Sequence, residues 1–517
     1  MKNRLHGLDH KTQTDVCDIA YRTVKGNPMH SGLQAKTLVF SFLLLLSACS
    51  LAPQYTRPDM PLPPALTETG FQSQTGESSD VQSIGWHDFF MDEQLRELIA
   101  IGLENNRDLK LAALTVAEAR ARHGVQRSER FPQAGADAGM AVTGGAGMRT
   151  QRAYEAALTV PAFELDFFGR LKNLTEASLE RYLASREAEK TVRLTLVSQV
   201  AQTWLEERLA SERLQLAKVT LKSWRSSLVF IESSVISGQS SLLELEQARS
   251  MVEFATSAVA QRERELVFAS NALQLLLGSF EKRMLPTALP LEEQKLAELP
   301  EELSSAVLLG RPDVMEAEHN LRAANADIGA ARAAFFPAIS LTGSMGYISN
   351  DLSTLFSSGS TAWTFLPRIT LPVFTAGRNR FNLEIATIRR ESSVIQYEKT
   401  LQTAFREVAD SLMSRASFIR QIEAQKKYLA SQNLVLELAG QRYINGTISY
   451  LEVLVAQRNV FQVKQDMLTI RHEQLVNEIN LYTALGGGLT GSLINAPEKG
   501  SAQHLARHEV TSQQLAQ

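Results

Sequence analysis

The sequence predicts a mostly α-helical chain with a membrane β-sheet portion, built as an internal two-fold repeat. Three observations support this prediction. Landmark residues recur in the same order in two halves of the chain. Two proline-free stretches carry helical apolar periodicity over roughly 67 residues each, and shorter segments between helices alternate apolar and polar residues as membrane strands do.

Composition excludes several classes of function before any motif is considered. The chain has 517 residues with 53 Lys and Arg against 56 Asp and Glu, so a formal net charge of −3 offers no basic face to nucleic acid. Its 2 Cys cannot form a disulfide framework or a four-thiolate zinc site, and its 9 His are scattered. No Gly-rich phosphate loop, nucleophile elbow or His-Glu-x-x-His motif occurs. We therefore predict that the protein is not an enzyme and holds no cofactor or metal.

The amino-terminal region has the pattern of a secretory signal. Residues 37–46 form an apolar run of about ten residues, too short to span a bilayer but typical of a signal core. The run continues into Leu46-Ser47-Ala48-Cys49, which resembles a bacterial lipoprotein box. Residues 1–48 are then removed, the Cys49 sulfur is acylated, and Ser50 indicates the outer membrane. A start at Met29 would give a conventional signal length; a buried Cys49 after an apolar helix is the structural alternative.

Internal repetition divides the remaining chain into two similar halves. Asp108 and Asp313 are 205 positions apart (313 − 108), and Gly238 and Gly446 are 208 apart (446 − 238). Other matched landmarks are Pro132 with Pro337, Phe168-Gly169-Arg170 with Ala376-Gly377-Arg378, and 271–278 with 480–487. Each half is predicted to run helix, β-rich segment, very long helix, turn, helix. We place the lipid anchor and an extended strap at 49–90, the repeats at 91–285 and 300–488, and a polar tail at 489–517.

Two very long helices follow from the apolar spacing. Apolar residues recur at three- and four-residue steps after Gly169 and after Gly377. Examples are Leu205, Leu209, Leu216 and Val219 in the first half and Leu401, Phe405, Val408 and Leu412 in the second. Roughly 67 residues at 1.5 Å each make a rod of about 100 Å, which must lie beside other rods. Gly238 and Gly446 are predicted to end these helices in tight reversals.

Alternation with a period of two predicts membrane-spanning strands between the helices. The apolar positions of these segments are Ile339, Leu341, Met345 and Tyr347, then Trp363, Phe365, Ile369 and Leu371, with weaker counterparts in 134–142 and 154–160. One face of each strand would meet lipid and the other water, where we place Arg368. A small soluble sheet is the alternative. The lipid anchor and the absence of an 18-residue apolar run after Cys49 favour the membrane.

Membrane strands of this number require several copies of the chain. Unpaired backbone groups in hydrocarbon cost several kcal/mol each, so a membrane sheet must close on itself. Four strands per chain are fewer than the roughly eight of the smallest barrels. A homotrimer would give 12 strands (3 × 4). The predicted fold is therefore a trimeric 12-stranded β-barrel continued by a long α-helical, coiled-coil-like periplasmic tube.

Several segments taken together resemble the TolC-like outer-membrane efflux factors, in particular the lipoprotein branch with OprM-type and NodT-type members. The resemblance covers about residues 49–490. The segments that carry it are Cys49 to Pro53, 86–122, Asp166 to Arg170, and Leu485-Gly486-Gly487-Gly488. His87, Glu93 and Leu489 stand where this family usually has an aromatic residue, Pro and Trp. These are packing positions, so they bear on local contacts rather than on membership.

The resemblance implies a passive duct in the bacterial outer membrane that exports small molecules from the periplasm to the exterior. It implies a homotrimer anchored in outer-membrane lipid, a periplasmic adaptor protein, and an inner-membrane efflux pump that supplies the energy. The cargo stays open, because the 12 Met do not cluster with His. The alternative is a lipid-anchored periplasmic coiled-coil scaffold without channel activity, which would have no need of the alternating segments.

The resemblance also implies an acidic ring near the second reversal. Glu452, six residues past Gly446, would face the pore with its two symmetry copies and repel anions at a constriction. Leu451 would add an apolar constriction beside it. A solvated Glu452 on the helix surface and ordinary helix packing of Leu451 are the alternatives.

A latch and a docking site for the adaptor complete the implied gate. Glu244, six residues past Gly238, would pair with Tyr443 or Arg442 of the neighbouring long helix and hold the tip closed. An exposed pair contributes only about 0 to 1 kcal/mol, so adaptor docking could release it. The turns at Gly238 and Gly446 would contact the adaptor; as an alternative they are only helix reversals.

Overall fold

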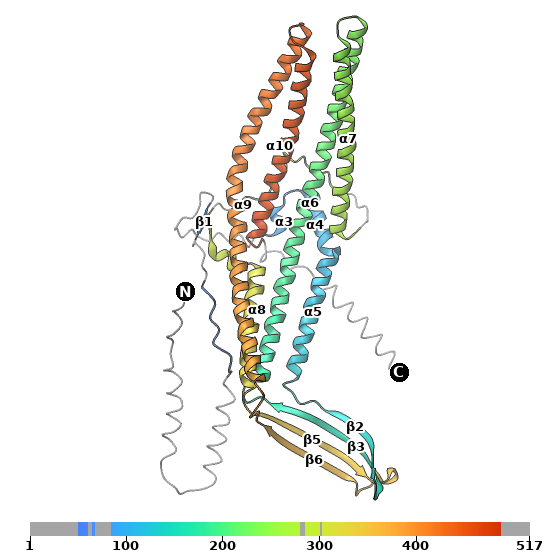
Figure 1. Cartoon of the computed structure of the whole chain (residues 1–517), viewed down its shortest axis with the longest axis vertical. Helices are drawn as coiled ribbons and strands as arrows, with labels where there is room; N and C mark the ends of the chain where they lie inside the picture. The colour runs from blue at the N-terminus through green and yellow to red at the C-terminus, as the bar shows by residue number, and fades with distance from the viewer. Residues whose placement is uncertain (1–49, 60–64, 68–83, 280–284, 300–301, 488–517) are drawn as a thin grey trace.

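The computed structural model describes residues 50–59, 65–67, 84–279, 285–299 and 302–487. The predicted signal region 1–48, the lipidation residue Cys49 and the tail 489–517 lie outside these described residues. The described helices form an elongated bundle of rods, and a four-stranded sheet lies beyond one end of it (Figure 1). Among the described helices, none contains an apolar stretch that could span a bilayer.

The two halves repeat the same order of elements, as predicted. The first half contains α5 (Arg107–Ser128), β2 (Gly135–Gly145), β3 (Met148–Leu165), α6 (Arg170–Ile236) and α7 (Leu242–Leu277). The second contains α8 (Pro312–Ala333), β5 (Ala338–Ser349), β6 (Thr361–Thr370), α9 (Arg378–Ile444) and α10 (Tyr450–Ala484). Short elements complete the described chain: β1 (Ala65–Thr67), α3 (Trp86–Phe89), α4 (Glu93–Asn105), β4 (Glu302–Ser304), η2 (Ser305–Gly310) and η3 (Leu352–Thr354).

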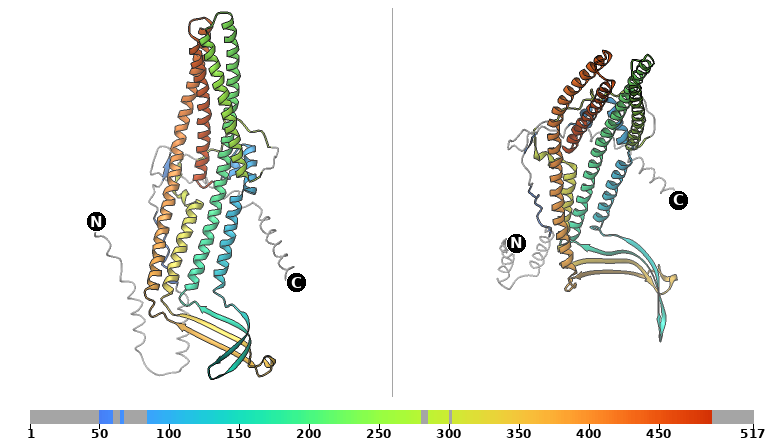
Figure 2. Two further views of the ribbon diagram at one scale, coloured as in Figure 1. Left: turned by 45° about the vertical axis from the view of Figure 1, so that its right-hand side comes forward. Right: turned by 45° about the horizontal axis from the view of Figure 1, so that its top comes forward.

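The two long helices, α6 and α9, each have 67 residues, which confirms the prediction from periodicity. They begin after Gly169 and Gly377, whose φ angles of 74° and 87° let the chain turn from strand to helix. On the sheet side α6 packs between α5 and α8, and α9 packs on α8. Toward the tip, α7 returns along α6 and α10 returns along α9 (Figure 2). Each long helix therefore lies beside other rods along its length.

The sheet has the strand order β2-β3-β5-β6, and every pair is antiparallel. Leu158, Met345 and Trp363 lie opposite one another on three adjacent strands, so their side chains share one face. These three side chains are between 68% and 74% exposed in the single chain. The opposite face carries polar groups, including the Ser344 and Thr364 hydroxyls, which hydrogen bond at 2.5 Å. The predicted alternation is confirmed, although β6 ends at Thr370 and leaves Leu371 outside the strand.

The largest apolar core lies midway along the rods, where α3 and α4 pack across α6 and the end of α10. Phe89 stacks on Tyr482 with ring centroids 4.1 Å apart, and both side chains are at most 1% exposed. Trp204 of α6 is fully buried and donates its indole N–H to the Gln94 side chain at 2.8 Å. This core, which includes residues more than 300 positions apart, holds the two halves together at mid-height.

One side chain in each half joins the sheet-side rod to the returning helix. Asn106, at the N-cap of α5, donates its amide N–H to the Leu276 carbonyl near the end of α7 at 2.9 Å. Arg311, at the N-cap of α8, donates to the Ala484 carbonyl at the end of α10 at 2.5 Å. Both donors satisfy carbonyl groups that the end of an α-helix leaves without partners. We call these two contacts the rod joints.

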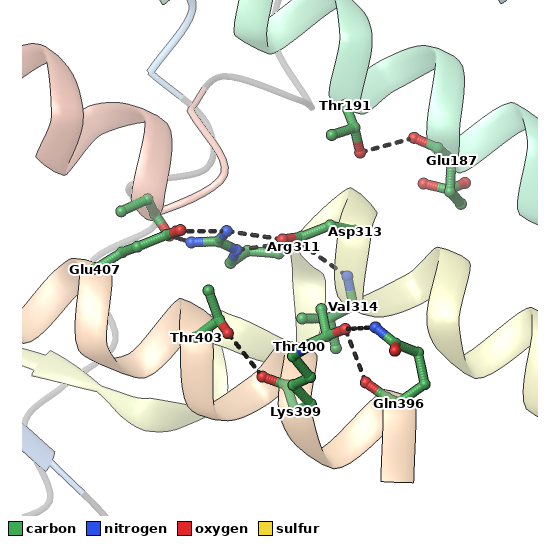
Figure 3. Close-up of polar contacts among 11 residues, drawn as sticks. Glu187, Thr191, Arg311, Asp313, Val314, Gln396, Lys399, Thr400, Thr403 and Glu407 are labelled. Carbon is green, nitrogen blue, oxygen red and sulfur yellow. Dashed lines mark hydrogen bonds and ion pairs between the residues drawn. The ribbon is translucent and has the colours of Figure 1, made fainter. Parts of the chain in front are cut away.

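The second rod joint carries a charge: Figure 3 shows Arg311 in contact with Asp313 and Glu407. Arg311 is 7% exposed, and its guanidinium contacts the carboxylates of Asp313 at 2.8 Å and Glu407 at 2.9 Å. Burial by itself lowers the pKa of Arg311, but hydrogen bonding and charge from Asp313 and Glu407 outweigh burial and leave the pKa raised. The guanidinium therefore stays charged, and its contacts join the start of α8 to α9 and to the end of α10.

The described residues 50–59, the start of the predicted strap, run along the sheet-side rods away from the sheet, from Ser50 near the start of α6 to Arg57 beside Glu318 (Figure 1). Its Arg57 guanidinium contacts the Glu318 carboxylate of α8 at 2.7 Å, and Arg322 contacts the same carboxylate at 2.7 Å. The Tyr55 hydroxyl donates to it at 3.2 Å. Burial raises the pKa of Glu318, but hydrogen bonds from Arg57 and Arg322 outweigh burial and leave the pKa lowered.

The lowered pKa of Glu318 predicts a pH dependence of stability. A group with a depressed folded-state pKa stabilises the fold above its unfolded pKa and loses that contribution as the pH falls through the folded value. We expect Glu318→Gln to cost about 2 kcal/mol at pH 7, because charge-assisted hydrogen bonds are lost. The melting-temperature difference between wild type and the variant should persist down to about pH 4.5 and shrink below it. A difference that stays constant from pH 7 to pH 3 would contradict this prediction.

Candidate functional site

The tip of the bundle is formed by two helix reversals of identical design. Gly238 and Gly446 have φ angles of 74° and 69°, which glycine adopts without strain. In the first turn the Gln239 amide donates to the Ser234 carbonyl at 2.8 Å. The equivalent bond of the second turn joins the Thr447 amide to the Arg442 carbonyl at 2.9 Å. These bonds are those of the Schellman motif that ends many helices, and they confirm the predicted reversals.

Glu244 lies in the first turn of α7, where it caps its own helix. Its carboxylate accepts from the Ser241 backbone N–H at 3.0 Å, and the Ser241 hydroxyl accepts from the Glu244 backbone N–H at 3.2 Å. This reciprocal pair is a capping box. Within the described chain, no hydrogen bond or ion pair joins Glu244 to Tyr443 or Arg442. The predicted latch would therefore compete with the cap for the same carboxylate.

Tyr443 instead connects the two hairpins through its hydroxyl and its ring. The hydroxyl lies 3.3 Å from the Ser240 hydroxyl in the α6–α7 turn, and the ring lies 5.3 Å from the ring of Tyr450 at the start of α10. Tyr450 is 4% exposed, and burial raises the pKa of its phenol. The structure thus places Tyr443 beside the α6–α7 turn, where its hydroxyl meets Ser240 rather than Glu244. The pattern gave no signal for Ser240 or Tyr450, because a contact across the hairpins has no period along the chain.

Glu452 occupies the position equivalent to Glu244 but is not engaged in the same way. Ser449 and Glu452 repeat the Ser-x-x-Glu spacing of Ser241 and Glu244 exactly 208 residues later (449 − 241), yet the Ser449 side chain makes no capping hydrogen bond. Glu452 is exposed, and its carboxylate has no hydrogen bond or ion pair within the described residues. The Glu244 carboxylate thus caps its own helix, whereas the equivalent Glu452 carboxylate is available to a partner.

Leu451 lies in a groove between the two returning helices. It is 50% exposed and lines a hollow of about 370 Å³ with Leu243 and Met251 of α7 and with Leu454 and Arg458 of α10. Arg442, the other predicted latch residue, is exposed in the last turn of α9. Within the described part of the chain, no three His, Cys, Asp or Glu side chains gather where they could hold a metal ion.

The sheet and the tip together define a class of protein. One end is a sheet with an exposed apolar face and the opposite end is a pair of helical hairpins, with a continuous wall of rods between them. This is the arrangement expected of a wall segment of a membrane duct. A profile described as outer membrane efflux protein matches residues 98–279 and 303–487. The chain belongs to the outer membrane efflux protein family.

Curated relatives agree with this assignment over nearly their whole length. The chain is 47% identical over 459 residues to the cation efflux system protein CusC of Escherichia coli strain K12, covering 88% of this chain and 99% of the relative. It is 45% identical to the probable outer membrane lipoprotein SilC of Salmonella typhimurium, with coverages of 88% and 98%. It is 43% identical to the solvent efflux pump outer membrane protein SrpC of Pseudomonas putida, with coverages of 88% and 99%.

Solved structures share the fold. The crystal structure of CusC matches with a TM-score of 0.78 and 47% identity, covering 85% of this chain and all of that one. The open state of the MtrE outer membrane channel of Neisseria gonorrhoeae matches with a TM-score of 0.79 and 35% identity, with coverages of 85% and 99%. The predicted resemblance, the fold class, the outer-membrane location and the role in efflux are therefore confirmed, and the family is one of channels rather than enzymes.

Proposed function

We propose that three copies of this chain close into one passive duct through which small molecules leave the periplasm. The observation that carries the proposal is the sheet, whose edge strands β2 and β6 pair on one side only within the described chain. An unpaired edge is not tolerated in hydrocarbon, so β6 of one copy would pair with β2 of the next. Three four-stranded sheets then give 12 strands (3 × 4) around one axis.

The rods support the same closure, because the outermost sheet-side helices also have exposed apolar side chains. On α5 these include Leu111 and Leu114, which are 61% and 65% exposed. On α9 they include Phe381 and Ile388, which are 58% and 53% exposed. Large apolar side chains repeated along a helix at three- and four-residue steps are normally covered by a neighbour. Helix α9 of one copy would cover α5 of the next, directly continuing the β6–β2 seam.

Membership of the family, rather than a visible site, supports the proposed partners and cargo class. A duct without a nucleotide-binding loop has no energy source of its own, so we propose that an inner-membrane pump supplies the energy. We propose that a periplasmic adaptor docks on the exposed turns at Gly238 and Gly446. The relatives are named for cation efflux and for solvent efflux. We therefore assign this chain the export of small molecules, without a narrower cargo.

The tip residues would form the closed gate of the trimer. Three Glu452 carboxylates would converge on the axis and three Leu451 side chains would narrow it, so that cations pass the constriction more easily than anions. Glu244 can pair with Tyr443 or Arg442 only when it leaves its capping box, which costs about 1 kcal/mol. The latch would therefore be weak, as a gate that a docking partner opens must be.

Conductance in planar bilayers tests the duct and the gate together. We expect wild type to give small, short-lived conductance events. The double variant Glu244→Gln with Glu452→Gln should give larger and longer ones, because it weakens the proposed latch and removes the charge of the proposed Glu452 ring. Glu253→Gln, an exposed acidic site further along α7, should behave as wild type. If wild type and the double variant both fail to conduct, the duct is wrong and the anchored scaffold is the better account.

A further inference from the structure

The apolar face of the sheet contains a hollow where three of its side chains are small. Alternation along the strands puts Ala136 and Ala138 of β2 and Ala156 of β3 on this face, because Ala136 pairs with Leu158 and Ala138 pairs with Ala156. We call these three residues the alanine floor. The hollow above them has a volume of about 450 Å³. Four larger residues border it: Leu158, Met345, Tyr347 and Phe356.

A structured loop forms one wall of this hollow. Phe356 belongs to the connection between β5 and β6, residues 350–360, and its ring meets the ring of Tyr347 edge-on with centroids 5.4 Å apart. The loop is closed by the Ser349 and Thr354 hydroxyls, which lie 2.6 Å apart. Phe356 is nevertheless 73% exposed. The wall is therefore in place without a ligand, as in most small-molecule sites, and it presents an apolar ring to whatever lies in the hollow.

One positively charged residue shares the face that carries the alanine floor. Arg152 of β3 is four residues from Ala156, so alternation puts both side chains on this face, about 13 Å apart along the strand. Arg152 is exposed, and within the described chain its guanidinium has no hydrogen bond or ion pair. The other charged residues that are paired in the described sheet alternate onto the opposite face: Asp137, Glu155, Glu164 and Arg368. There the Asp137 carboxylate, whose residue also borders the hollow, accepts from the Thr159 hydroxyl at 2.6 Å.

The positions of Arg152 and of the hollow match the two parts of a membrane lipid. A cation on a lipid-facing strand is costly at the centre of a bilayer and costs little near the headgroups. Arg152 lies closer than Ala156 to the β2–β3 hairpin, which is at the end of the sheet away from the rods (Figure 1). With the rods in the periplasm, this end reaches the outer leaflet. A guanidinium near the headgroups and an apolar hollow at greater depth suit a phosphate and an acyl chain, respectively.

We propose that Arg152 and the alanine floor bind one anionic, phosphate-bearing lipid of the outer leaflet. One acyl chain would lie on the alanine floor against Leu158 and Phe356, and the phosphate would accept hydrogen bonds from the Arg152 guanidinium, which can bind two oxygens at once. A second copy of the chain would leave the hollow free, because copies of the proposed duct meet at the edges β2 and β6. This inference rests on the proposed function, which places the sheet in the bilayer.

Native mass spectrometry of the full-length trimer, titrated with lipid A and with lipid A stripped of its phosphates, tests the contact with Arg152. We expect wild type to bind lipid A at least tenfold more tightly than the stripped lipid. Arg152→Gln should bind the two lipids alike, because the change and the stripping remove the same contact. Arg368→Gln, which removes a cation from the opposite face of the sheet, should keep the wild-type preference.

A second pair of variants tests the hollow. Ala138→Phe fills the space above the alanine floor and should weaken the binding of both lipids at least fivefold, while the preference for phosphate stays. Ala141→Phe places the same ring on the opposite face of the same strand and should bind as wild type does. Heat-modifiable gel mobility confirms that each variant is a folded trimer before it is titrated.

Three outcomes would overturn the proposal. The first is a phosphate preference that survives in Arg152→Gln, and the second is equal binding by Ala138→Phe and Ala141→Phe, which would mean an unspecific lipid layer. The third is association of trimers through this face in place of lipid binding. Conductance separates this proposal from the duct. A wild type that never conducts refutes the duct but leaves an Arg152-dependent preference intact, whereas a conducting wild type without the preference refutes only the lipid site.

Discussion

Replacing Gly346 with alanine is expected to prevent the sheet from forming, and with it the channel. Gly346 of β5 lies opposite Ala157 of β3, and a Cβ on it would lie 2.7 Å from the Ala157 Cβ and overlap the backbone of Ala156 and Ala157. Backbone atoms cannot turn aside as a flexible side chain can. The central β3–β5 pair would have to separate, at a cost of about 3 kcal/mol or more, leaving backbone groups unpaired in the membrane.

Heat-modifiable gel mobility of the membrane fraction and the number of conducting channels per amount of protein measure this effect. We expect both to fall at least tenfold for Gly346→Ala, since about 1.4 kcal/mol corresponds to a factor of ten. Gly343→Ala is the matched control on the same strand, because the nearest atom to a Cβ there is the Thr364 carbonyl oxygen at 3.6 Å. If the number of channels falls equally in both variants, or falls in neither, the close approach of β3 and β5 at Gly346 does not control whether the sheet forms.

Replacing Arg311 with alanine is expected to cost about 3 to 5 kcal/mol of folding free energy, the usual result of removing one partner of a buried ion pair. The change leaves the Asp313 and Glu407 carboxylates without their shared cation and removes the donor to the Ala484 carbonyl at the end of α10. Denaturant unfolding followed by circular dichroism provides the measurement.

Two further variants serve as controls. One removes an arginine that is exposed, and the other removes a rod joint that carries no charge. Arg420→Ala removes an exposed arginine of α9, the helix that carries Glu407, and should shift stability by less than about 0.5 kcal/mol. Asn106→Ala removes the neutral joint of the first half and should cost about 1 to 2 kcal/mol. If Arg311→Ala costs no more folding free energy than Asn106→Ala, the charge of Arg311 adds nothing to the hydrogen bond that Arg311 donates to the Ala484 carbonyl.

Much of the fold could be predicted because its signals are periodic and repeated. The spacing after Gly169 and Gly377 gave the length of both long helices, and glycine at 238 and 446 gave the reversals, since a left-handed residue is required there. The alternation around Met345 and Trp363 gave the face of the sheet that carries apolar side chains. The candidate gate was predicted less fully. The sequence placed Glu244 and Glu452 at equivalent positions, but not the cap that engages only the first of them.

By itself, the sequence determined the elements, because helices, strands and turns depend on residues a few positions apart, and it placed the chain in its family through short motifs. Only the tertiary structure decided which polar groups meet across long separations: Arg311 with Ala484, Tyr443 with Ser240, and Arg57 with Glu318. Such contacts leave no period in the sequence. They depend on how rods cross and on which groups the crossing removes from water, and these conditions exist only once the chain has packed.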